Sequence, residues 1–217
     1  MLEKIALCVE RGKVNAESRY PPELKGQKGA DELTRIALEK GIQPKDILSS
    51  ALIPGMQRVG EKFRRNKIYL PDVLVAAKAM TAAMRHLKPY FVSGDVKHEG
   101  RVVIGTVSGD LHDIGKRIVA MFLEGGGWEV IDCGVDISTQ DFVEAIKKYK
   151  PAAVGMSALL TTTMVNMEET VKTIKSKYPE VKVLVGGAPV TRRFAQKIGA
   201  DMTSAHPQEV VEYLKNQ

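Results

Sequence analysis

The chain has 217 residues, of which 44% are hydrophobic and 27% are charged. These are ordinary proportions for a globular protein, and the length suits two small domains. No stretch approaches the roughly 20 uncharged apolar residues that cross a bilayer, and the first residues, MLEKIALCVERGK, carry too many charges for a signal peptide. We therefore expect a cytoplasmic protein without a membrane segment.

The charged residues and the cysteines argue against further classes of protein. The net charge of +6 comes from Lys and Arg interleaved with Asp and Glu, whereas a nucleic-acid-binding protein tends to gather its positive charge in a patch or an arm. The two cysteines, Cys8 and Cys133, form no C-x-x-C pair, so neither a zinc site nor a redox dithiol is indicated. We expect no nucleic-acid partner and no disulfide.

The first 91 residues carry helical patterns and predict a small helical bundle. An opening helix over 2–11 is followed by a polar loop, NAESRYPPELKGQKG. Asp31 is expected to cap the next helix, and Gly41 to end it. Pro44 is expected in the first turn of a helix that continues through PGMQRVGEKFRRN. A last helix starts near Pro71, with apolar residues at helical spacing: Val73, Ala77, Met80 and Met84.

A polar segment over 92–100 forms the expected domain boundary, and residues 101–217 then alternate strands with helices. The first strand, RVVIGTV, is a continuous apolar run, which is typical of a strand buried on both faces. Such alternation predicts an α/β domain with a doubly wound, flavodoxin-like parallel sheet of five strands. The five expected strands cover 101–107, 128–134, 152–159, 182–187 and 200–203.

The loops after the first and third strands should contain the functional site. In a five-stranded flavodoxin-like sheet, ligands bind beyond the carboxyl ends of the strands where the strand order reverses. The first of these loops, SGDLHDIG, contains Asp110, His112 and Gly115 in the pattern D-x-H-x-x-G. A carboxylate two residues before the histidine can accept a proton from one ring nitrogen, which leaves the other nitrogen for a metal. Gly115 permits either the close approach of a large flat ligand or tight helix packing.

A single imidazole suits only some kinds of metal site. A zinc site needs three or four protein ligands, whereas one axial histidine suits a metal that a macrocycle already holds. Gly186 and Gly187 end the fourth strand and can leave a slot beside the sheet, although a tight turn is the simpler explanation of the pair on its own. Neither G-x-G-x-x-G nor a Walker motif follows the first strand, so a phosphate-binding loop is not indicated.

Taken together, these motifs resemble the cobalamin-binding region of B12-dependent methionine synthase. They resemble even more the separate corrinoid proteins of methanol, methylamine and methoxylated-aromatic methyltransferase systems. The similarity covers nearly the whole chain: a helical cap over 1–91, a linker over 92–100, and a Rossmann-like B12-binding domain over 101–217. The supporting residues are GDLHDIG, S-x-L with Ser157 and Leu159, the Gly186–Gly187 pair, and G-E-K-F-x6-L-P-D over 60–72.

The resemblance implies a role for each matching residue. His112 would be the lower axial ligand of cobalt in a base-off, His-on cofactor, with Asp110 as its hydrogen-bond partner and Thr163 completing the relay. A second group would line the slot for the displaced nucleotide tail: Ser157, Leu159, Gly186 and Gly187. A third group would cover the upper face of the cofactor: Phe63, Leu70 and, less closely matched, Val73. Because Pro71 follows Leu70, a turn is expected between Phe63 and Leu70.

The implied function is that of a methyl carrier, with cobalt cycling between Co(I) and methyl-Co(III). One substrate-specific methyltransferase would load the methyl group, a second would pass it to folate, a thiol or a similar acceptor, and a reductive activase would restore Co(I). The chemistry would belong to the cofactor, so the chain is not expected to turn over alone. The methyl donor and acceptor stay open.

The sequence departs from the family pattern at two places, and other functions remain possible. Lys116 is followed by Arg117 where the family often has Lys-Asn, and Gly199–Thr203 replaces the usual Gly-Ala-Asp-Gly-Tyr. The alternatives are a B12-binding sensor, the small subunit of an adenosylcobalamin mutase, and a nucleotide-binding flavodoxin-like module. A sensor would need an output domain, and the mutase subunits lack the Phe63–Leu70 cap.

Overall fold

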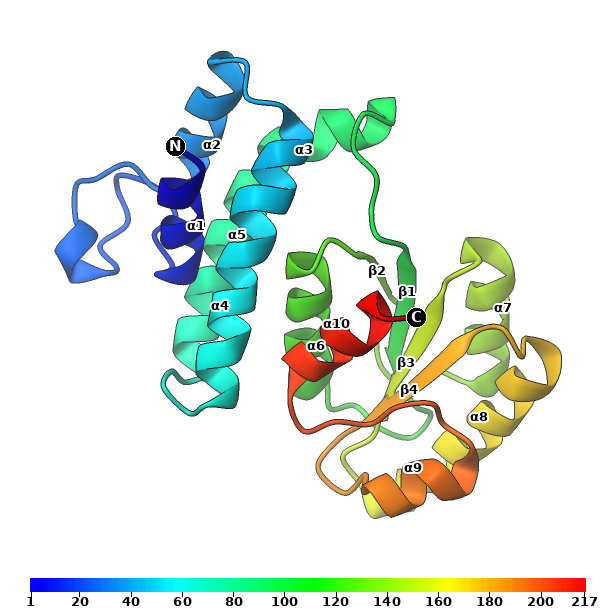
Figure 1. The fold of residues 1–217 in the computed structure, drawn as a ribbon. Helices are drawn as coiled ribbons and strands as arrows, with labels where there is room; N and C mark the ends of the chain where they lie inside the picture. Colours follow the sequence, from blue (N-terminus) through cyan, green and yellow to red (C-terminus); the bar gives the residue numbers. More distant parts are fainter. The chain divides into compact units, whose positions relative to one another are not determined.

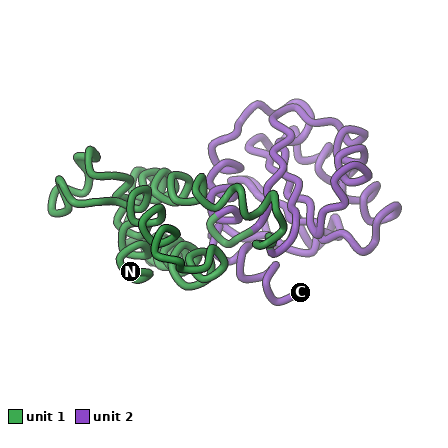
Figure 2. The backbone as a smooth tube through the Cα atoms, turned by 90° about the horizontal axis from the view of Figure 1, so that it is seen from above, with its two compact units in different colours: residues 1–98, 125–127 green, residues 99–124, 128–217 purple.

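Helices make up the first part of the chain, and helices alternate with strands in the rest, in a computed structural model that describes residues 1–217 (Figure 1). The residues form two units (Figure 2). The first unit comprises Met1–His98 with Gly125–Gly127, and the second comprises Glu99–Glu124 with Trp128–Gln217. None of the helices combines the length and the apolar character that crossing a membrane requires. The division into cap, linker and cofactor domain stays a prediction.

The first unit is helical, as its periodic apolar residues predict. Its helices bury residues that recur three or four apart, such as Ile5, Cys8 and Val9, or Ala76, Ala79, Met80 and Ala83. Two short turns lie between the helices, a 3-10 turn over Pro22–Leu24 and a π turn over Leu48–Leu52. The helices are α1 (Leu2–Glu10), α2 (Ala30–Glu39), α3 (Pro44–Ile47), α4 (Ile53–Arg64) and α5 (Leu70–Ser93).

The π turn joins α3 and α4 into one helical segment that contains Pro54. Proline inside a helix removes one N–H donor, and its ring crowds the carbonyl group one turn earlier. In the wider turn, the Ile53 amide donates to the Leu48 carbonyl, five residues back. This pattern makes room for the proline ring without ending the helix.

The ends of the helices correct one prediction and support another. Asp31 does not cap α2, because the helix begins at Ala30 and Gly29 is its N-cap residue. The Glu32 carboxylate accepts from the Gly29 amide (2.9 Å), and the Asp31 carboxylate instead lies 2.6 Å from the His86 ring. The turn expected before Pro71 is present, since α4 ends at Arg64 and α5 begins at Leu70. Helix α5 runs on to Ser93, past Pro89 and into the predicted linker.

The second unit is an α/β fold around a parallel sheet of four strands in the order β2-β1-β3-β4. Each pair of neighbouring strands is parallel, with Val103 opposite Val154 and Val154 opposite Val183 in the central register. Strands β1, β3 and β4 are short and largely buried, as their apolar runs predict, whereas the edge strand β2 is partly exposed. Their bounds are β1 (Arg101–Thr106), β2 (Glu129–Asp132), β3 (Ala153–Ser157) and β4 (Lys182–Gly186).

The fifth strand expected over 200–203 is not confirmed. Met202 forms a single parallel bridge with Leu184 at the edge of the sheet. The Asp201 amide donates to the Val183 carbonyl (2.8 Å), but the Asp201 carboxylate accepts the Val183 amide (2.6 Å), where a strand would offer a backbone carbonyl. One side chain thus takes a backbone donor of β4, which limits the pairing to one bridge.

Helices cover both faces of this sheet, as right-handed crossovers require. Figure 1 shows α6 and α10 on one face and α7 and α8 on the other. The core between the sheet and α7 and α8 is apolar, with Val103, Phe142, Val154, Met167 and Val171 all buried. The helices are α6 (Ile114–Gly125), α7 (Thr139–Tyr149), α8 (Met164–Lys177), α9 (Arg192–Ile198) and α10 (Pro207–Lys215), with a 3-10 turn over Thr161–Thr163.

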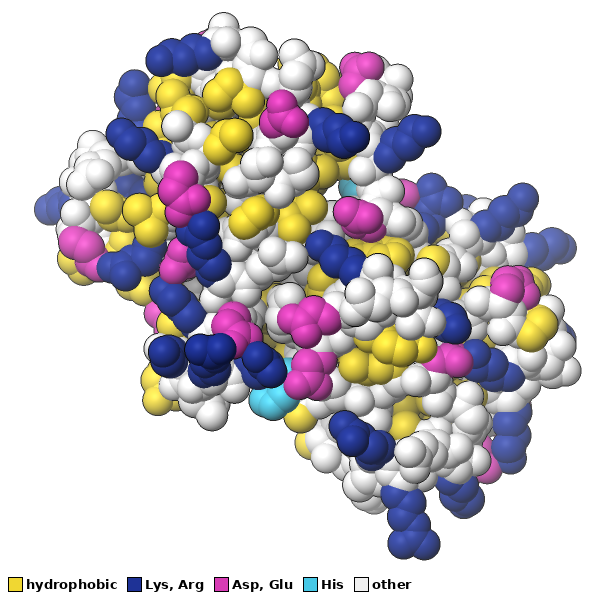
Figure 3. Space-filling model, viewed as in Figure 1, with side chains coloured by type: hydrophobic (Ala, Val, Ile, Leu, Met, Phe, Trp, Pro, Cys, Tyr) yellow, Lys and Arg dark blue, Asp and Glu magenta, His cyan; other side chains and the backbone are white.

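The surface charges are mixed in sign. On the face shown in Figure 3, Lys and Arg side chains are spread over the surface and alternate with Asp and Glu. Several pair along one helix, as Arg35 does with Glu39 and Lys172 with Glu168. This face carries the interleaved pattern that the sequence indicates.

Candidate functional site

The loops that follow β1, β2 and β3 meet at Asp110. Strands β1 and β3 are neighbours, and the chain leaves β1 for α6 on one face and β3 for α8 on the other. Loops that diverge in this way leave a crevice at the carboxyl edge of a parallel sheet. The loop over 107–113, which contains the predicted histidine and is called the His loop below, lies at this edge.

His112 is held by Asp110 through two hydrogen bonds to one carboxylate oxygen. The His112 backbone amide donates to Asp110 Oδ1 (3.1 Å), and the ring Nδ1 lies 2.8 Å from the same oxygen. The Thr106 hydroxyl, at the end of β1, donates to the His112 carbonyl (2.9 Å). Both the main chain and the ring of His112 are therefore fixed by neighbours.

The second oxygen of Asp110 accepts three donors from the segment after β3. The amides of Leu159 and Leu160 donate to Asp110 Oδ2 (2.7 and 3.2 Å), and so does the Thr163 hydroxyl (2.9 Å). Asp110 is fully buried (0% exposed). Burial favours the neutral acid, but the hydrogen bonds from His112, Leu159 and Thr163 outweigh it and hold the pKa of the Asp110 carboxyl well below its usual range.

An ionised carboxylate can only accept hydrogen bonds, so it fixes the tautomer of His112. In the neutral imidazole, Nδ1 carries the proton that it donates to Asp110, and Nε2 keeps its lone pair. The His112 side chain is 52% exposed, and Nε2 has no hydrogen-bond partner within the chain. The site therefore presents one oriented imidazole nitrogen to the outside, which is the arrangement of a metal ligand supported by a carboxylate.

Exposed apolar side chains lie on the His loop, on the segment after β3 and in the first turns of α6 and α8. Large apolar side chains are normally buried in a domain core, and a set of exposed ones along one edge marks a place for a ligand or a partner. They are Leu111 (72% exposed), Ile114 (67%), Val165 (65%), Leu160 (42%) and Leu159 (41%). The chemistry available at this edge is one nitrogen donor with apolar side chains on the neighbouring loops and helix starts.

The predicted slot residues lie at the ends of the adjacent strands β3 and β4 or directly after them. In the register of the sheet, Ser157 of β3 is opposite Thr106 of β1 on one side and Gly186 of β4 on the other. A Cβ atom at Gly186 would meet no atom within 4 Å, so packing does not explain this glycine. The same is true of Gly115, which removes tight helix packing as its explanation.

Gly187 differs from Gly186 because the backbone itself requires it. Its φ angle is +127°, a conformation that residues with side chains rarely adopt, and a Cβ atom would lie 1.8 Å from the Ala158 carbonyl oxygen. The Gly186–Gly187 pair therefore combines open space at the first position with close contact between β4 and the segment after β3 at the second.

The three predicted cap residues belong to the first unit, and the structure describes them there. Val73 is fully buried in α5, whereas Phe63, in α4, and Leu70, at the start of α5, are partly exposed. Their predicted contact with a cofactor stays a prediction.

The two departures from the family pattern have structural partners. Arg117, which stands where the family often has Asn, pairs with the Asp113 carboxylate (2.7 Å) at the start of α6. In the segment Gly199–Thr203, Asp201 binds the Val183 amide and the Lys175 ammonium group. The first departure thus forms a local ion pair at the start of α6, and the second joins β4 to α8.

Several residues of the site were not predicted from the sequence. Leu160 contributes through its amide, Thr106 through its hydroxyl, and Asp136 and Asn166 contact the His loop from the loop after β2 and from α8. The position of Asp136 after the second strand is a signal that points to the same edge of the sheet. For Asn166, inside a helical pattern, the sequence offers no such signal.

Comparison with known proteins agrees with this geometry. A family model described as a B12 binding domain matches residues 100–213, and a second model of the same description matches residues 27–88. The chain is 42% identical over 190 residues to trimethylamine corrinoid protein 1 of Methanosarcina acetivorans, which covers 86% of this chain and 88% of that protein. It is 42% identical over 185 residues to dimethylamine corrinoid protein 1 of Methanosarcina mazei, covering 82% and 86%.

Two solved structures are similar over the length of the chain. A cobalamin-binding protein from Desulfitobacterium hafniense superposes with a TM-score of 0.77 and 29% identity, covering 100% of this chain and 98% of that one. A chain of the methanol:cobalamin methyltransferase complex from Methanosarcina barkeri gives 0.80 and 27%, covering 98% and 78%. With its D-x-H-x-x-G loop at the edge of a parallel sheet and these relatives, the chain belongs to the B12-binding family of corrinoid proteins.

Proposed function

We propose that this chain is a methyl carrier that binds cobalamin or a related corrinoid with His112 as the lower ligand of cobalt. The observation that supports this most is the ionised, fully buried Asp110, which directs Nε2 of a half-exposed imidazole outward. When bound, the corrinoid supplies a cobalt ion that can take up and release a methyl group. The residues of the chain bind the cofactor, orient the imidazole and hold its Nδ1 proton.

The residues at the edge of the sheet fit a corrinoid. The exposed apolar side chains around His112 match the largely apolar faces of a corrin ring. The open space at Gly186 and Gly115 leaves room for a bulky ligand where a side chain would otherwise stand. We assign Ser157, Leu159, Gly186 and Gly187 to the slot for the nucleotide tail. We assign Phe63 and Leu70 to the upper face, with Val73 as a less closely matched member of that group.

The Asp110–Thr163 side of the site serves to keep the imidazole in one protonation state. Thr163 donates to Asp110 and lies 2.8 Å from the Leu160 carbonyl. The carboxylate therefore has donors on both oxygens even when His112 loses its bond to cobalt. Such a relay keeps the Nδ1 proton in place without a rearrangement of the loop.

The partners that we propose are methyltransferases. The relatives are named as corrinoid proteins of trimethylamine and dimethylamine, and one similar structure is part of a methanol:cobalamin methyltransferase complex. We infer that a substrate-specific methyltransferase loads this chain, that a second one unloads it to a folate, a thiol or a similar acceptor, and that a reductive activase maintains the cofactor. A B12 sensor or a mutase subunit is less favoured, because these relatives match more than four fifths of the chain.

The experiment that tests the carrier function uses the purified chain loaded with methylcobalamin. The holo-chain alone is expected to show no repeated turnover when it is mixed with a free thiol as methyl acceptor. The same is expected when the holo-chain is first reduced and then mixed with trimethylamine or methanol as methyl donor. Addition of a matching methyltransferase should start methyl transfer through the bound cofactor, and the His112→Ala chain should respond less. Sustained turnover between free substrates by the holo-chain alone would overturn the carrier function.

A further inference from the structure

The three residues before Leu111 in the His loop are held by two residues, Asp136 and Asn166, that have no hydrogen bond with His112. These residues, Ser108, Gly109 and Asp110, form four hydrogen bonds with Asp136 and Asn166. Gly109 has a φ angle of +80°, so the loop turns at a residue with wide conformational freedom. A loop of this kind needs contacts on both sides if it is to keep one conformation.

Asp136 holds the loop from the segment after β2. Its Oδ1 accepts from the Gly109 amide (2.7 Å) and from the Ser108 hydroxyl (3.2 Å), and its own amide donates to the Asp110 carbonyl (3.1 Å). Asp136 adopts a φ angle of +55°, which is uncommon for a residue with a side chain. This conformation places its amide and its carboxylate on neighbouring residues of the His loop.

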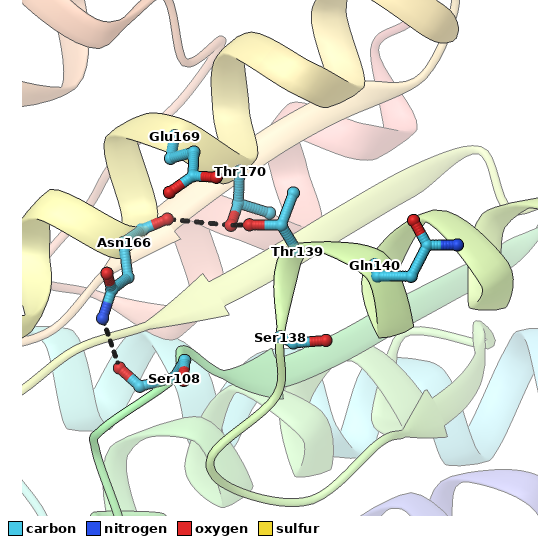
Figure 4. A pocket seen from close by; sticks show the side chains of 7 residues that line it. All are labelled: Ser108, Ser138, Thr139, Gln140, Asn166, Glu169 and Thr170. Carbon is cyan, nitrogen blue, oxygen red and sulfur yellow. Dashed lines mark hydrogen bonds between the residues drawn. The ribbon is translucent and has the colours of Figure 1, made fainter.

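Asn166 holds the loop from α8. Its Nδ2 donates to the Ser108 carbonyl (2.7 Å), and Figure 4 shows this bond beside a polar cavity. The cavity has a volume of about 290 Å³ and is lined by Ser108, Asn166 and residues of α7 and α8. Its wall is braced by the Thr170 hydroxyl, which donates to the Asn166 carbonyl (2.8 Å) and lies 2.8 Å from the Thr139 hydroxyl.

We propose that Asp136 and Asn166 are positioning residues that set the conformation of the His loop before the corrinoid binds. This inference rests on the proposed role of His112 as the axial ligand. Hydrogen bonds to the backbone of residues 108–110 fix the position of the Asp110 main chain and so of its carboxylate. That carboxylate in turn fixes the imidazole of His112. A loop already ordered in the binding conformation loses less conformational entropy when the ligand arrives.

A double-mutant cycle with cobinamide tests this proposal, because cobinamide has no nucleotide tail and depends on the ring and on His112. Asp136→Ala and Asn166→Leu are each expected to weaken cobinamide binding roughly fivefold, the effect of about one net hydrogen bond. In the His112→Ala chain, the same substitutions should have no further effect, since they act through the imidazole. In the apo-chain, the Gly109 amide should exchange its hydrogen faster in Asp136→Ala.

Two control variants separate positioning from general stability. Gln140→Ala removes a side chain from the wall of the same cavity, where it bonds Glu144 and not the His loop, so binding should not change. Asp136→Asn keeps an oxygen acceptor for the Gly109 amide and should bind close to wild type. The protein melting temperature is recorded for each variant, so that a folding defect is recognised.

The outcomes distinguish this inference from the proposed function. If His112→Ala changes neither the affinity nor the visible spectrum, the proposed axial ligand is wrong. If His112→Ala does weaken binding, but Asp136→Ala and Asn166→Leu weaken it equally with and without His112, the two residues do not act through the imidazole. That second result, or unchanged binding in folded variants, would overturn the positioning role.

Discussion

Asp110 is the residue on which the site depends. Its two carboxylate oxygens and its carbonyl group accept hydrogen bonds from donors in three loops. Most carboxylates at a protein surface are instead hydrogen-bonded to water. A buried charge of this kind is stable only because every direction is filled by a donor. Because these donors hold the Asp110 carboxylate in one position, the His112 ring bonded to it has one orientation.

Substitution of Asp110 by Asn should weaken the site without removing the ligand. The amide nitrogen must face either the Leu159 and Leu160 amides or the His112 Nδ1, and each choice sets donor against donor. We expect corrinoid affinity to fall about 10- to 100-fold, as is typical when the carboxylate behind a histidine ligand is lost. The measurement is the dissociation constant of cobinamide, determined from the change in its visible spectrum during titration.

Asp113→Asn is the matched control for that variant. Asp113 lies next to His112 and pairs with Arg117 (2.7 Å) at the start of α6. It has no contact with the imidazole, so its substitution should leave the affinity near the wild-type value. If Asp110→Asn and Asp113→Asn weakened cobinamide binding equally, charge near the loop would matter more for affinity than the Asp110–His112 bond.

At the scale of residues, the sequence was informative where side chains carry the chemistry. The D-x-H pattern predicted the Asp110–His112 pair, and the family resemblance led to Thr163. The amides of Leu159 and Leu160 were not predictable, because every residue has an amide and only the loop conformation selects these two. Asp136 depends on a positive φ angle, which its position in the sequence does not reveal.

At the scale of elements, the glycines at the end of β4 have separate tasks. Gly187 allows the backbone to pass Ala158 closely, whereas Gly186 faces open space. The fold alone explains the glycine at position 187, but it does not explain the glycine at position 186. Within the proposed tail slot, we therefore assign the open space to Gly186 and the close approach of the backbone to Ala158 to Gly187.

Gly186→Val should block the slot while the fold persists. Because nothing lies within 4 Å of a Cβ atom at this position, the melting temperature should stay near the wild-type value. Cobalamin, which has a nucleotide tail, should bind at least about tenfold more weakly, the effect of roughly 1.4 kcal/mol of steric conflict. Cobinamide, which lacks the tail, should bind as before, and equal losses for both ligands would contradict a tail slot at Gly186.

Gly187→Ala provides the contrast. A methyl group there would overlap the Ala158 carbonyl oxygen in a backbone conformation that costs about 1–3 kcal/mol for a residue with a side chain. Its melting temperature should fall, and both ligands should be affected alike. A stable Gly187→Ala chain would mean that the close approach of β4 to Ala158 is not needed.

The elements also show where sequence patterns stop being sufficient. The four strands and the helices between them follow from apolar periodicity and turn residues. The fifth strand did not form beyond one bridge, because the Asp201 side chain takes a backbone donor of β4. Likewise, Gly29 and Glu32 cap α2 while Asp31 lies against His86, and residue type alone cannot separate such neighbouring candidates.

At the scale of the whole molecule, the helical first unit and the α/β second unit match the order of elements that the sequence predicts. The family models fall on both, at residues 27–88 and 100–213. In the function that we propose, the partner methyltransferase recognises the methyl donor. A single experiment can decide whether His112 is the ligand of cobalt in the proposed corrinoid site.

The most direct measurement is electron paramagnetic resonance of the Co(II) form of the holo-chain, prepared with ¹⁵N-labelled histidine and with ordinary histidine. An axial nitrogen splits each cobalt line, into three with ¹⁴N and into two with ¹⁵N. We predict that the threefold splitting becomes twofold in the labelled chain and is lost in His112→Ala. A splitting that ignores the label, or that persists unchanged in His112→Ala, would contradict the assignment of His112 as the ligand of cobalt.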